Sequence, residues 1–510
     1  MSTHTARTQR LAVRARRSAI LALLLLAALV PLSSPRSSAQ DAPRAAAPLE
    51  RTLSALVTRA ALGERVALSV VDARTGRVLF AHHAELALNP ASNEKLITAA
   101  TALTSLGADF RMLTGVYGTI EGDAVVGGLY LKGAGDPTLR LADFVELAEA
   151  LVDRGVRRID EVVVDGTYFD ERFLPPAFEQ QPNEVAAFRA PVSALAVDGN
   201  SYELRVVPGA SEGAPAVVRL DASGYFELTN EVTTTAVGEP RVIADQRGSG
   251  EKMTLRVRGT VPLGIRGVSY RRRVENPVPF AGHAFVEALR RLGIRTPMRV
   301  RVAATPPGAP MITSHRSPPL FQILTALGKD SDNFVAEMVL KVVGAERRRP
   351  GRTAEGAAAA IALLERVGVP HGAATIVNGS GLFDGNLVAA SHFTKLLSHV
   401  YRDPSLRSEY LAHLAIGGVD GTLRNRLRDV PRGVVRAKTG TLGDAIALSG
   451  FVLGPADEAL AFSVITNGVR GKHGPARALC DDTVRALVAQ LHATYTLSAM
   501  PAAASSEAED

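Results

Sequence analysis

A serine and a lysine three residues apart, Ser92 and Lys95, form the first group in this chain that could do chemistry. Positions three apart share one face of a helix, so the Lys95 amine could take the proton of the Ser92 hydroxyl. The two residues are therefore a candidate nucleophile and base. A pattern this short also recurs by chance, and the alternative is an exposed serine beside a solvated lysine.

Two further motifs carry polar groups. Ser331 and Asn333 form a Ser-x-Asn pattern, which capping of the next helix would explain by itself. A Lys-Thr-Gly-Thr motif occupies residues 438–441 and is equally common in isolation. Their order along the chain and their structural setting therefore carry the information.

Helices and strands are expected around these motifs in a definite order. Pro90 suits the first turn of a helix, and apolar residues at helical spacing continue until Gly107. Residues 320–327 and 334–343 have helical patterns, which puts residues 331–333 in the connection between them. Strands are expected at residues 65–72, 77–82, 445–453 and 459–466.

A long stretch between the first two motifs shows two kinds of pattern. Residues 113–189 predict a hairpin, a helix at 141–155 and a strand at 159–165, and a helix at 282–293 with a strand at 298–303 resumes this α/β pattern. Residues 190–276 alternate with period two between Gly and Pro turns, which predicts an all-β module. We therefore expect two modules inserted into a parent domain.

The first 39 residues have the pattern of a secretory signal peptide. Six arginines and no acid accompany an apolar run at residues 19–30, and Ser37-Ser38-Ala39 supplies small residues for cleavage. The run is shorter than the about 20 residues of a membrane span, although an uncleaved anchor stays an alternative. We expect an exported protein, periplasmic or associated with the cell wall, by the Sec or the twin-arginine route. Residues 495–510 predict a disordered tail without an anchor.

Composition excludes several classes of function. The six N-terminal arginines account for most of the formal net charge of +7, and no basic stripe interleaved with aromatic residues follows, so no nucleic-acid partner is expected. The single cysteine, Cys480, has apolar neighbours at helical spacing, which predicts a core thiol. His82-His83 lacks a third ligand at suitable spacing for a metal. The sequence does not determine the oligomeric state.

The three motifs together are the set found in serine β-lactamases and penicillin-binding proteins. The interval between Ser92 and Ser331 is several times longer than a class A β-lactamase needs. The chain therefore resembles the D-alanyl-D-alanine carboxypeptidase/endopeptidase family, the class C low-molecular-mass penicillin-binding proteins, which carry two domains inserted after the first motif. The resemblance runs from about residue 49 to residue 492 and includes Gly135-Asp136-Pro137-Thr138-Leu139, Val164-Asp165-Gly166, Val197-Asp198-Gly199-Asn200, Gly379-Ser380-Gly381-Leu382, Val419-Asp420-Gly421-Thr422-Leu423 and Leu448-Ser449-Gly450.

This resemblance implies a multidomain α/β fold. Residues 48–112 and 308–494 would form a penicillin-binding domain with helices around an antiparallel sheet. Residues 113–189 and 277–307 would form the inserted α/β domain, and residues 190–276 the inserted β-rich domain. The implied activity is cleavage of D-alanyl bonds in peptidoglycan stem peptides or cross-links, inhibited by β-lactams and requiring neither a metal nor an organic cofactor.

The resemblance also assigns roles to the motif residues. Ser92 would form the acyl-enzyme, and Lys95 would act as its base once burial and the Lys438 charge lower its pKa. Ser331 would relay a proton to the leaving amine, and Asn333 would hold the substrate peptide. The terminal carboxylate would bind at Lys438, Thr439, Gly440 and Thr441, and the backbone N–H groups of Ser92 and Thr441 would form the oxyanion hole.

Two acids suggest an altered substrate preference. Where the family reads Asp-Gly-Ser-Gly-Leu-Ser-Arg, residues 378–384 read Asn-Gly-Ser-Gly-Leu-Phe-Asp, so Asp384 replaces the customary basic residue. Asp165 matches a family position that faces the amino end of the stem-peptide side chain. We expect the two acids to favour a more cationic side-chain tip.

Two other functions remain as alternatives. A class A β-lactamase needs a dedicated glutamate for deacylation. Glu355 and Glu365 follow Asn333 at loosely comparable distances, but they fall in or beside a predicted helix, residues 357–367. The other alternative is a non-catalytic wall-binding or scaffolding protein on the same fold.

Overall fold

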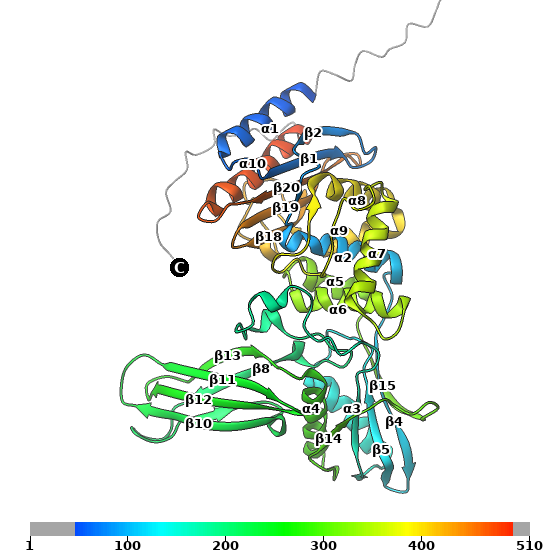
Figure 1. The fold of residues 1–510 in the computed structure, drawn as a ribbon, viewed down its shortest axis with the longest axis vertical. Coiled ribbons are helices and arrows are strands. Elements are labelled where there is room, and N and C mark those ends of the chain that lie inside the picture. The colour runs from blue at the N-terminus through cyan, green and yellow to red at the C-terminus, as the bar shows by residue number, and fades with distance from the viewer. Residues whose placement is uncertain (1–45, 493–510) are drawn as a thin grey trace, which may run out of the picture. The chain divides into compact units, whose positions relative to one another are not determined.

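The computed structural model describes residues 46–492 (Figure 1). The predicted signal peptide and the predicted tail lie outside the described residues. Within residues 46–492, none of the helices combines the length and the apolar character that crossing a bilayer requires.

A six-stranded antiparallel sheet joins the two ends of the described chain (Figure 1). The N-terminal strand β1 pairs with β20 from near the C-terminus along its whole length. This confirms the predicted antiparallel sheet. In spatial order its strands are β17 (Ala415–Ile416), β18 (Val435–Leu442), β19 (Ala445–Leu453), β20 (Ala459–Asn467), β1 (Val66–Asp72) and β2 (Val78–His82).

The central strands of this sheet are apolar on both faces because helices cover both. Side chains of one parity, such as Ala67 and Val71, pack into a core with α2 (Glu94–Leu106) and α8 (Ala390–Arg402). Those of the other parity, such as Leu68, pack under α1 (Ala46–Ala60) and α10 (His473–Leu491). The predicted core thiol is confirmed, because Cys480 on α10 is fully buried and burial raises its pKa to about 12.

The helices on the α2 side build the part of the fold that carries the motifs. One core joins α2 and α8 to further helices: α5 (Leu320–Gly328), α6 (Asn333–Arg347), α7 (Thr353–Arg366) and α9 (Pro404–His413). A 3₁₀ turn, η1 (Ala91–Asn93), precedes α2, and Gly107 ends that helix as predicted. Asn333 begins α6 rather than lying in the connection, because Asp332 caps the helix by accepting a hydrogen bond from Val335 N at 3.0 Å. Strand β3 (Ala87–Leu88), just before η1, pairs with β16 (Val388–Ala389), just before α8.

A second sheet belongs to the inserted α/β segment. Helices α3 (Leu141–Asp153) and α4 (Pro277–Arg291) pack against its strands (Figure 1). Helix α4 begins five residues before the predicted start, because Pro277 occupies its first turn. The strands are β14 (Val300–Val302), β7 (Val162–Asp165), β5 (Ala124–Lys132), β4 (Leu113–Glu121) and β15 (Met311–Arg316), with β6 (Arg158–Ile159) beside β5. The predicted boundary at residue 308 is too early, since β15 completes this sheet by pairing with β4.

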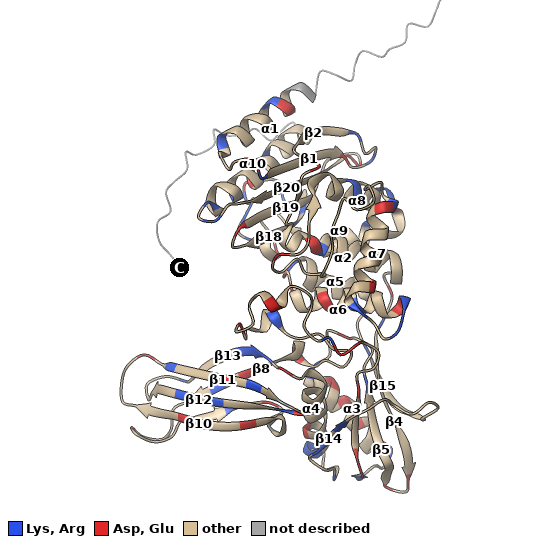
Figure 2. Cartoon of the chain, in the orientation of Figure 1, with Lys and Arg blue, Asp and Glu red and all other residues tan. Residues whose placement is uncertain are grey.

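The predicted all-β segment forms two three-stranded sheets. The first, in the order β10 (Phe226–Thr235), β12 (Lys252–Pro262), β11 (Arg241–Ser249), contains a parallel pair, and the second holds β13 (Val268–Arg273), β8 (Ser201–Val207) and β9 (Val217–Arg219). Cross-strand ion pairs, Arg256 with Glu231 and Arg258 with Asp245, place both charge signs on the first sheet (Figure 2). The two inserted segments share a single apolar core, and we propose that they form the two inserted domains.

Candidate active site

The Lys95 amine is the centre of the site. Its Nζ lies 3.0 Å from Ser92 Oγ, 2.7 Å from Asn333 Oδ1 and 2.7 Å from the Ser380 carbonyl oxygen. A neutral amine has two N–H bonds and one lone pair. The two carbonyl oxygens can only accept, so they take the two N–H groups and leave the lone pair facing the Ser92 hydroxyl. This arrangement suits a base.

Burial gives the Lys95 amine a suitable pKa. Its side chain is fully buried, and burial lowers the pKa to about 7, against the opposing charges of Glu337, Asp332 and Glu94. The sequence argument anticipated burial but not these three acids. Burial and the Lys95 charge also hold the pKa of Lys438 well below its usual value. The Lys95 charge therefore disfavours the charged form of Lys438.

The second and third motifs meet at Ser331. Lys438 Nζ donates to Ser331 Oγ at 2.8 Å and to the Thr439 carbonyl oxygen at 2.9 Å. Ser331 has a left-handed backbone, φ +60°, a strained conformation for a non-glycine residue that is held between α5 and α6. The fold thus brings together all five residues expected to be catalytic: Ser92, Lys95, Ser331, Asn333 and Lys438.

Strand β18 presents an open edge to this site. Its neighbour β17 pairs only with Arg436 and Ala437. In the part of the chain that the structure describes, residues 438–442 therefore have a strand partner, β19, on one side only. Gly440 lets the strand approach the nucleophile's turn, since a Cβ there would lie 2.9 Å from the Pro90 carbonyl oxygen. An extended substrate could add to this edge as a further strand.

Side chains beside β18 fix the position of the nucleophile's turn. Asn93 donates to the Lys438 carbonyl oxygen at 2.8 Å and accepts from Ser449 N at 3.2 Å, which joins η1 to β18 and β19. Thr439 Oγ1 lies 2.8 Å from Thr422 Oγ1, and the Thr441 side chain is exposed. Thr441 is therefore accessible to a ligand lying along the edge.

A cavity of about 450 Å³ adjoins the Ser-x-Asn motif. Ser331 and Asn333 line one part of it, and Phe188, Arg140 and Arg271 from the inserted segments line another. The inserted segments therefore supply a wall beside the catalytic residues, where they can contact a large substrate.

The sequence reasoning missed Glu337 and gave Ser380 no role in the site. The fully buried Glu337 carboxylate accepts from Gly379 N at 3.1 Å and from Ser380 N at 2.8 Å, which fixes the loop whose Ser380 carbonyl receives Lys95. The sequence held one signal for Glu337: it is an acid among apolar residues of α6, one turn after Asn333. Because a glutamate is rarely buried without a partner, such a position indicates a polar partner inside the fold.

Glu94 is a second buried acid that the sequence reasoning missed. Its side chain is fully buried, and neither carboxyl oxygen has a hydrogen-bond partner among the described residues. Burial and the Glu337 charge raise its pKa well above the usual value. Burial therefore disfavours the charged form of Glu94, whose charge would raise the pKa of Lys95.

The two acids expected to bind substrate have different surroundings. Asp384 is exposed, and its Oδ1 accepts from Asn89 Nδ2 at 2.8 Å, while Asn89 Oδ1 accepts from Ala91 N at 2.9 Å. This chain of bonds links Asp384 to the nucleophile's turn. Asp165 is fully buried, and its oxygens accept hydrogen bonds from Thr167 and from Thr305 N, so its role toward a substrate stays a prediction.

The glutamates considered for a β-lactamase lie on helix α7. Glu365 is exposed and its Oε1 is 2.6 Å from His371 Nδ1, and Glu355 stands in the first turn of the helix. Neither is among the groups bonded to Lys95 in the described part of the chain. The helix predicted around Glu365 is confirmed, with its start at Thr353.

Comparison with known proteins identifies relatives over nearly the whole described chain. Residues 49–488 match the D-Ala-D-Ala carboxypeptidase 3 (S13) family. A D-alanyl-D-alanine carboxypeptidase of Actinomadura sp. (strain R39) is 35% identical over 93% of this chain and 91% of its own length. D-alanyl-D-alanine carboxypeptidase DacB of Haemophilus influenzae is 23% identical over 80% of this chain and 86% of its own.

Solved structures share the fold. Penicillin-binding protein 4 (dacB) of Haemophilus influenzae aligns with a TM-score of 0.70 at 23% identity, covering 82% of this chain and 93% of that one. The same protein complexed with a β-lactam aligns with a TM-score of 0.69 at 22% identity, covering 86% and 99%. At this identity the likeness supports the multidomain α/β fold.

Proposed function

The chain belongs to the D-Ala-D-Ala carboxypeptidase 3 (S13) family, and from this premise we propose that Ser92 cleaves D-alanyl bonds of peptidoglycan stem peptides. The protein is a serine-type D-Ala-D-Ala carboxypeptidase. One observation carries the assignment of the site: Lys95 Nζ, with a pKa lowered to about 7, lies 3.0 Å from Ser92 Oγ and has acceptors for both N–H bonds of its neutral form.

The proposed reaction begins with the loss of the Ser92 proton to Lys95. Ser92 Oγ attacks the carbonyl carbon of the penultimate D-alanine, and the backbone N–H groups of Ser92 and Thr441 stabilise the oxyanion. Ser331, bonded to Lys438, passes a proton to the amine of the leaving D-alanine as the peptide bond breaks. Ser331 regains a proton from the Lys95 ammonium, which restores the neutral amine. Water then attacks the acyl carbon while Lys95 takes its proton, and that proton passes to Ser92 Oγ as the ester bond breaks.

Substrate binding is proposed at the open edge of β18. Lys438, Thr439, Gly440 and Thr441 receive the terminal carboxylate, whose negative charge favours the protonated form of Lys438. Asn333 holds the peptide. In a cross-link the leaving group is a second stem peptide, so the same attack gives endopeptidase activity. A β-lactam acylates the same hydroxyl.

Location follows from the substrate. Peptidoglycan lies outside the cytoplasmic membrane, so we infer an exported protein, periplasmic or associated with the cell wall. No nucleic acid takes part in the proposed reaction, and neither a metal nor an organic cofactor has a role in its steps.

Digestion of a defined substrate tests the proposal. A pentapeptide stem ending in D-Ala-D-Ala and purified cross-linked cell wall are incubated with wild type and with Ser92→Ala, and products are identified by mass. Wild type is expected to release one D-alanine and to split cross-linked dimers, and Ser92→Ala to do neither. Nitrocefin turnover with rapid recovery from penicillin would point to a β-lactamase. A folded wild type that takes no penicillin label would leave only a wall-binding role.

We propose that Asp384 favours stem peptides with a cationic side-chain tip. Asp384→Asn is expected to lower the ratio of kcat/KM for lysine or amidated diaminopimelate stems over meso-diaminopimelate stems by about two- to fivefold, since exposed charge pairs have modest effects. Glu365→Gln, an exposed acid on α7, is the control and should leave the ratio unchanged. Equal ratios in wild type and Asp384→Asn would contradict the proposal.

A further inference from the structure

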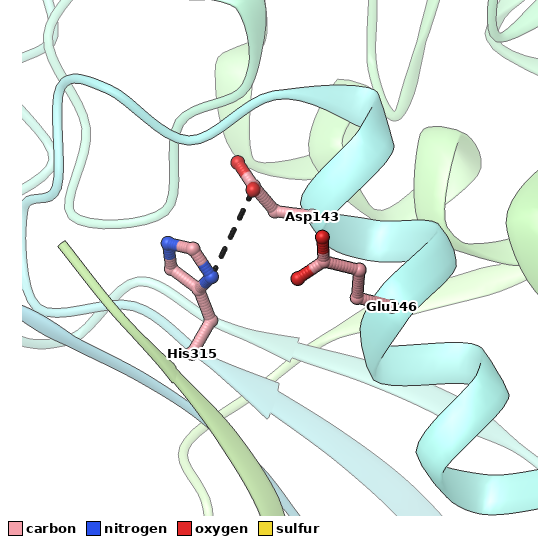
Figure 3. Close-up of side chains that lie close together, drawn as sticks. All are labelled: Asp143, Glu146 and His315. Atoms are coloured by element: carbon pink, nitrogen blue, oxygen red, sulfur yellow. Dashed lines mark ion pairs between the residues drawn. The ribbon is translucent and has the colours of Figure 1, made fainter.

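Two carboxylates and one imidazole converge between a helix and a strand of the inserted α/β segment. Asp143 and Glu146 lie three residues apart on α3 and so share a face, and His315 lies on β15, which packs beside α3. Figure 3 shows both carboxylates directed toward the His315 ring. Each residue offers one ligand atom, and these atoms all lie within 4.8 Å of one another.

A fourth side chain, Asp136, gives independent evidence for a ligand here. Its side chain is 1% exposed, and its Oδ1 accepts from Thr138 N at 2.8 Å and from Thr138 Oγ1 at 2.6 Å. The buried Oδ2 has no hydrogen-bond partner among the described residues and faces His315 Nε2 at 3.7 Å. A buried carboxylate oxygen without a donor is costly, so this oxygen favours a proton on Nε2.

A proton on Nε2 leaves the lone pair of the imidazole on Nδ1. That nitrogen lies 3.8 Å from Asp143 Oδ1 (Figure 3). The other oxygen of Asp143 already accepts from Arg140 N at 2.7 Å, which fixes the carboxylate and leaves Oδ1 for another partner. His315 Nδ1 and the carboxylate oxygens of Asp143 and Glu146 would then all be electron-pair donors facing one another. A cation between them would satisfy all three. A carboxylate behind a ligating histidine is the usual support of a metal-binding imidazole.

We propose that Asp143, Glu146 and His315 bind one Zn²⁺ ion, with Asp136 as a positioning residue behind His315. One imidazole nitrogen and two carboxylate oxygens suit zinc, whereas magnesium and calcium prefer oxygen ligands alone. Ligand atoms of a tetrahedral zinc ion lie about 3.4 Å apart, so the three ligand atoms, which lie within 4.8 Å of one another and 3.8 Å apart for His315 Nδ1 and Asp143 Oδ1, must move closer when the ion binds.

The bound ion would join α3 to β15. Strand β15 ends four residues before α5, which leads to Ser331. Zinc would therefore stabilise the inserted segment at its return to the catalytic helices without touching Ser92 or Lys95. This consequence does not depend on the proposed activity, because metal binding is measured directly.

Zinc titration of the whole chain tests the site. Protein prepared without a polyhistidine tag and stripped with a chelator is titrated with ZnCl₂ by calorimetry, and thermal melting is followed with and without the metal. Wild type should bind one ion and melt at higher temperature with zinc. Glu146→Gln and His315→Gln should weaken binding at least tenfold, and Asp136→Asn should weaken it about 10- to 100-fold. Glu149→Gln, an exposed acid one turn along α3, should match wild type.

A cooperative thermal melt of every variant shows that each one is folded. The proposal is overturned if folded wild type shows no saturable zinc binding, or if Glu146→Gln and His315→Gln bind as tightly as wild type. Loss of binding in His82→Gln alone would place the ion at the stacked His82 and His83 rings instead and would also overturn it. Equally tight binding of Mg²⁺ or Ca²⁺ would overturn the choice of zinc.

Discussion

Lys95→Ala is expected to slow the acylation of Ser92 by penicillin by about 1,000-fold or more, within the range for loss of a general base. Lys95 Nζ is the side-chain group bonded to the Ser92 hydroxyl in the described structure, so no neighbour replaces it. Acylation is measured as the rate of covalent labelling by a fluorescent penicillin. Ser92→Ala gives the background, since it removes the labelled atom.

Lys95→Arg separates the base from the charge. A guanidinium keeps the positive charge but does not deprotonate in proteins, so this variant should be as slow as Lys95→Ala. Labelling by Lys95→Arg within tenfold of the wild-type rate would show that the amine acts only through its charge.

The pH dependence of acylation reports the same amine. The neutral form is the base, so the wild-type rate should rise with pH through about 7, the value to which burial lowers the Lys95 pKa. The Glu337 charge raises the pKa of Lys95. Burial raises the pKa of Glu337 itself, and the backbone N–H groups of Gly379 and Ser380 oppose that shift by favouring the carboxylate. Glu337→Gln removes this charge and should move the rise to lower pH. An unchanged profile, or one moved to higher pH, would contradict this role.

Gly381→Ala is expected to disrupt the nucleophile's turn. A Cβ at this position would lie 1.9 Å from the Ala91 carbonyl oxygen, and the backbone is left-handed with φ +72°. The left-handed conformation alone costs about 1–2 kcal/mol for an L-residue, and relief of the clash must displace the backbone next to Ser92. A displacement of about 1 Å at a reacting group can cost about 100-fold in rate. We therefore expect a lower melting temperature and penicillin labelling slowed by about 100-fold or more.

Gly372→Ala is the matched control for this change. Gly372 has a similar backbone, φ +75°, but nothing lies within 4 Å of the position of its Cβ. It should lose some stability and keep the wild-type labelling rate. If Gly381→Ala labels as fast as Gly372→Ala, the contact with Ala91 does not position Ser92.

The spacing of apolar residues along the chain was sufficient to predict the helix after Ser92 and the strands of the inserted segments. Apolar spacing together with Pro90 and Gly107 predicted the helix after Ser92, and period-two alternation predicted the strands of the inserted segments. These signals are carried by neighbouring residues, so they need no knowledge of distant parts of the chain. Boundaries were less accurate, as at α4 and β15, because a proline in the first turn and a distant strand partner decided them.

The sequence by itself determined which residues carry the chemistry, because three motifs in order specify their types and spacing. Only the tertiary structure decided how these residues interact. It put Asn333 and the Ser380 carbonyl on the Lys95 amine, and it buried Glu337, Glu94 and Asp165. It also brought Asp136 and His315 together across the inserted segment. Contacts between residues so far apart in the chain arise from packing, and burial then sets the pKa values on which the reaction depends.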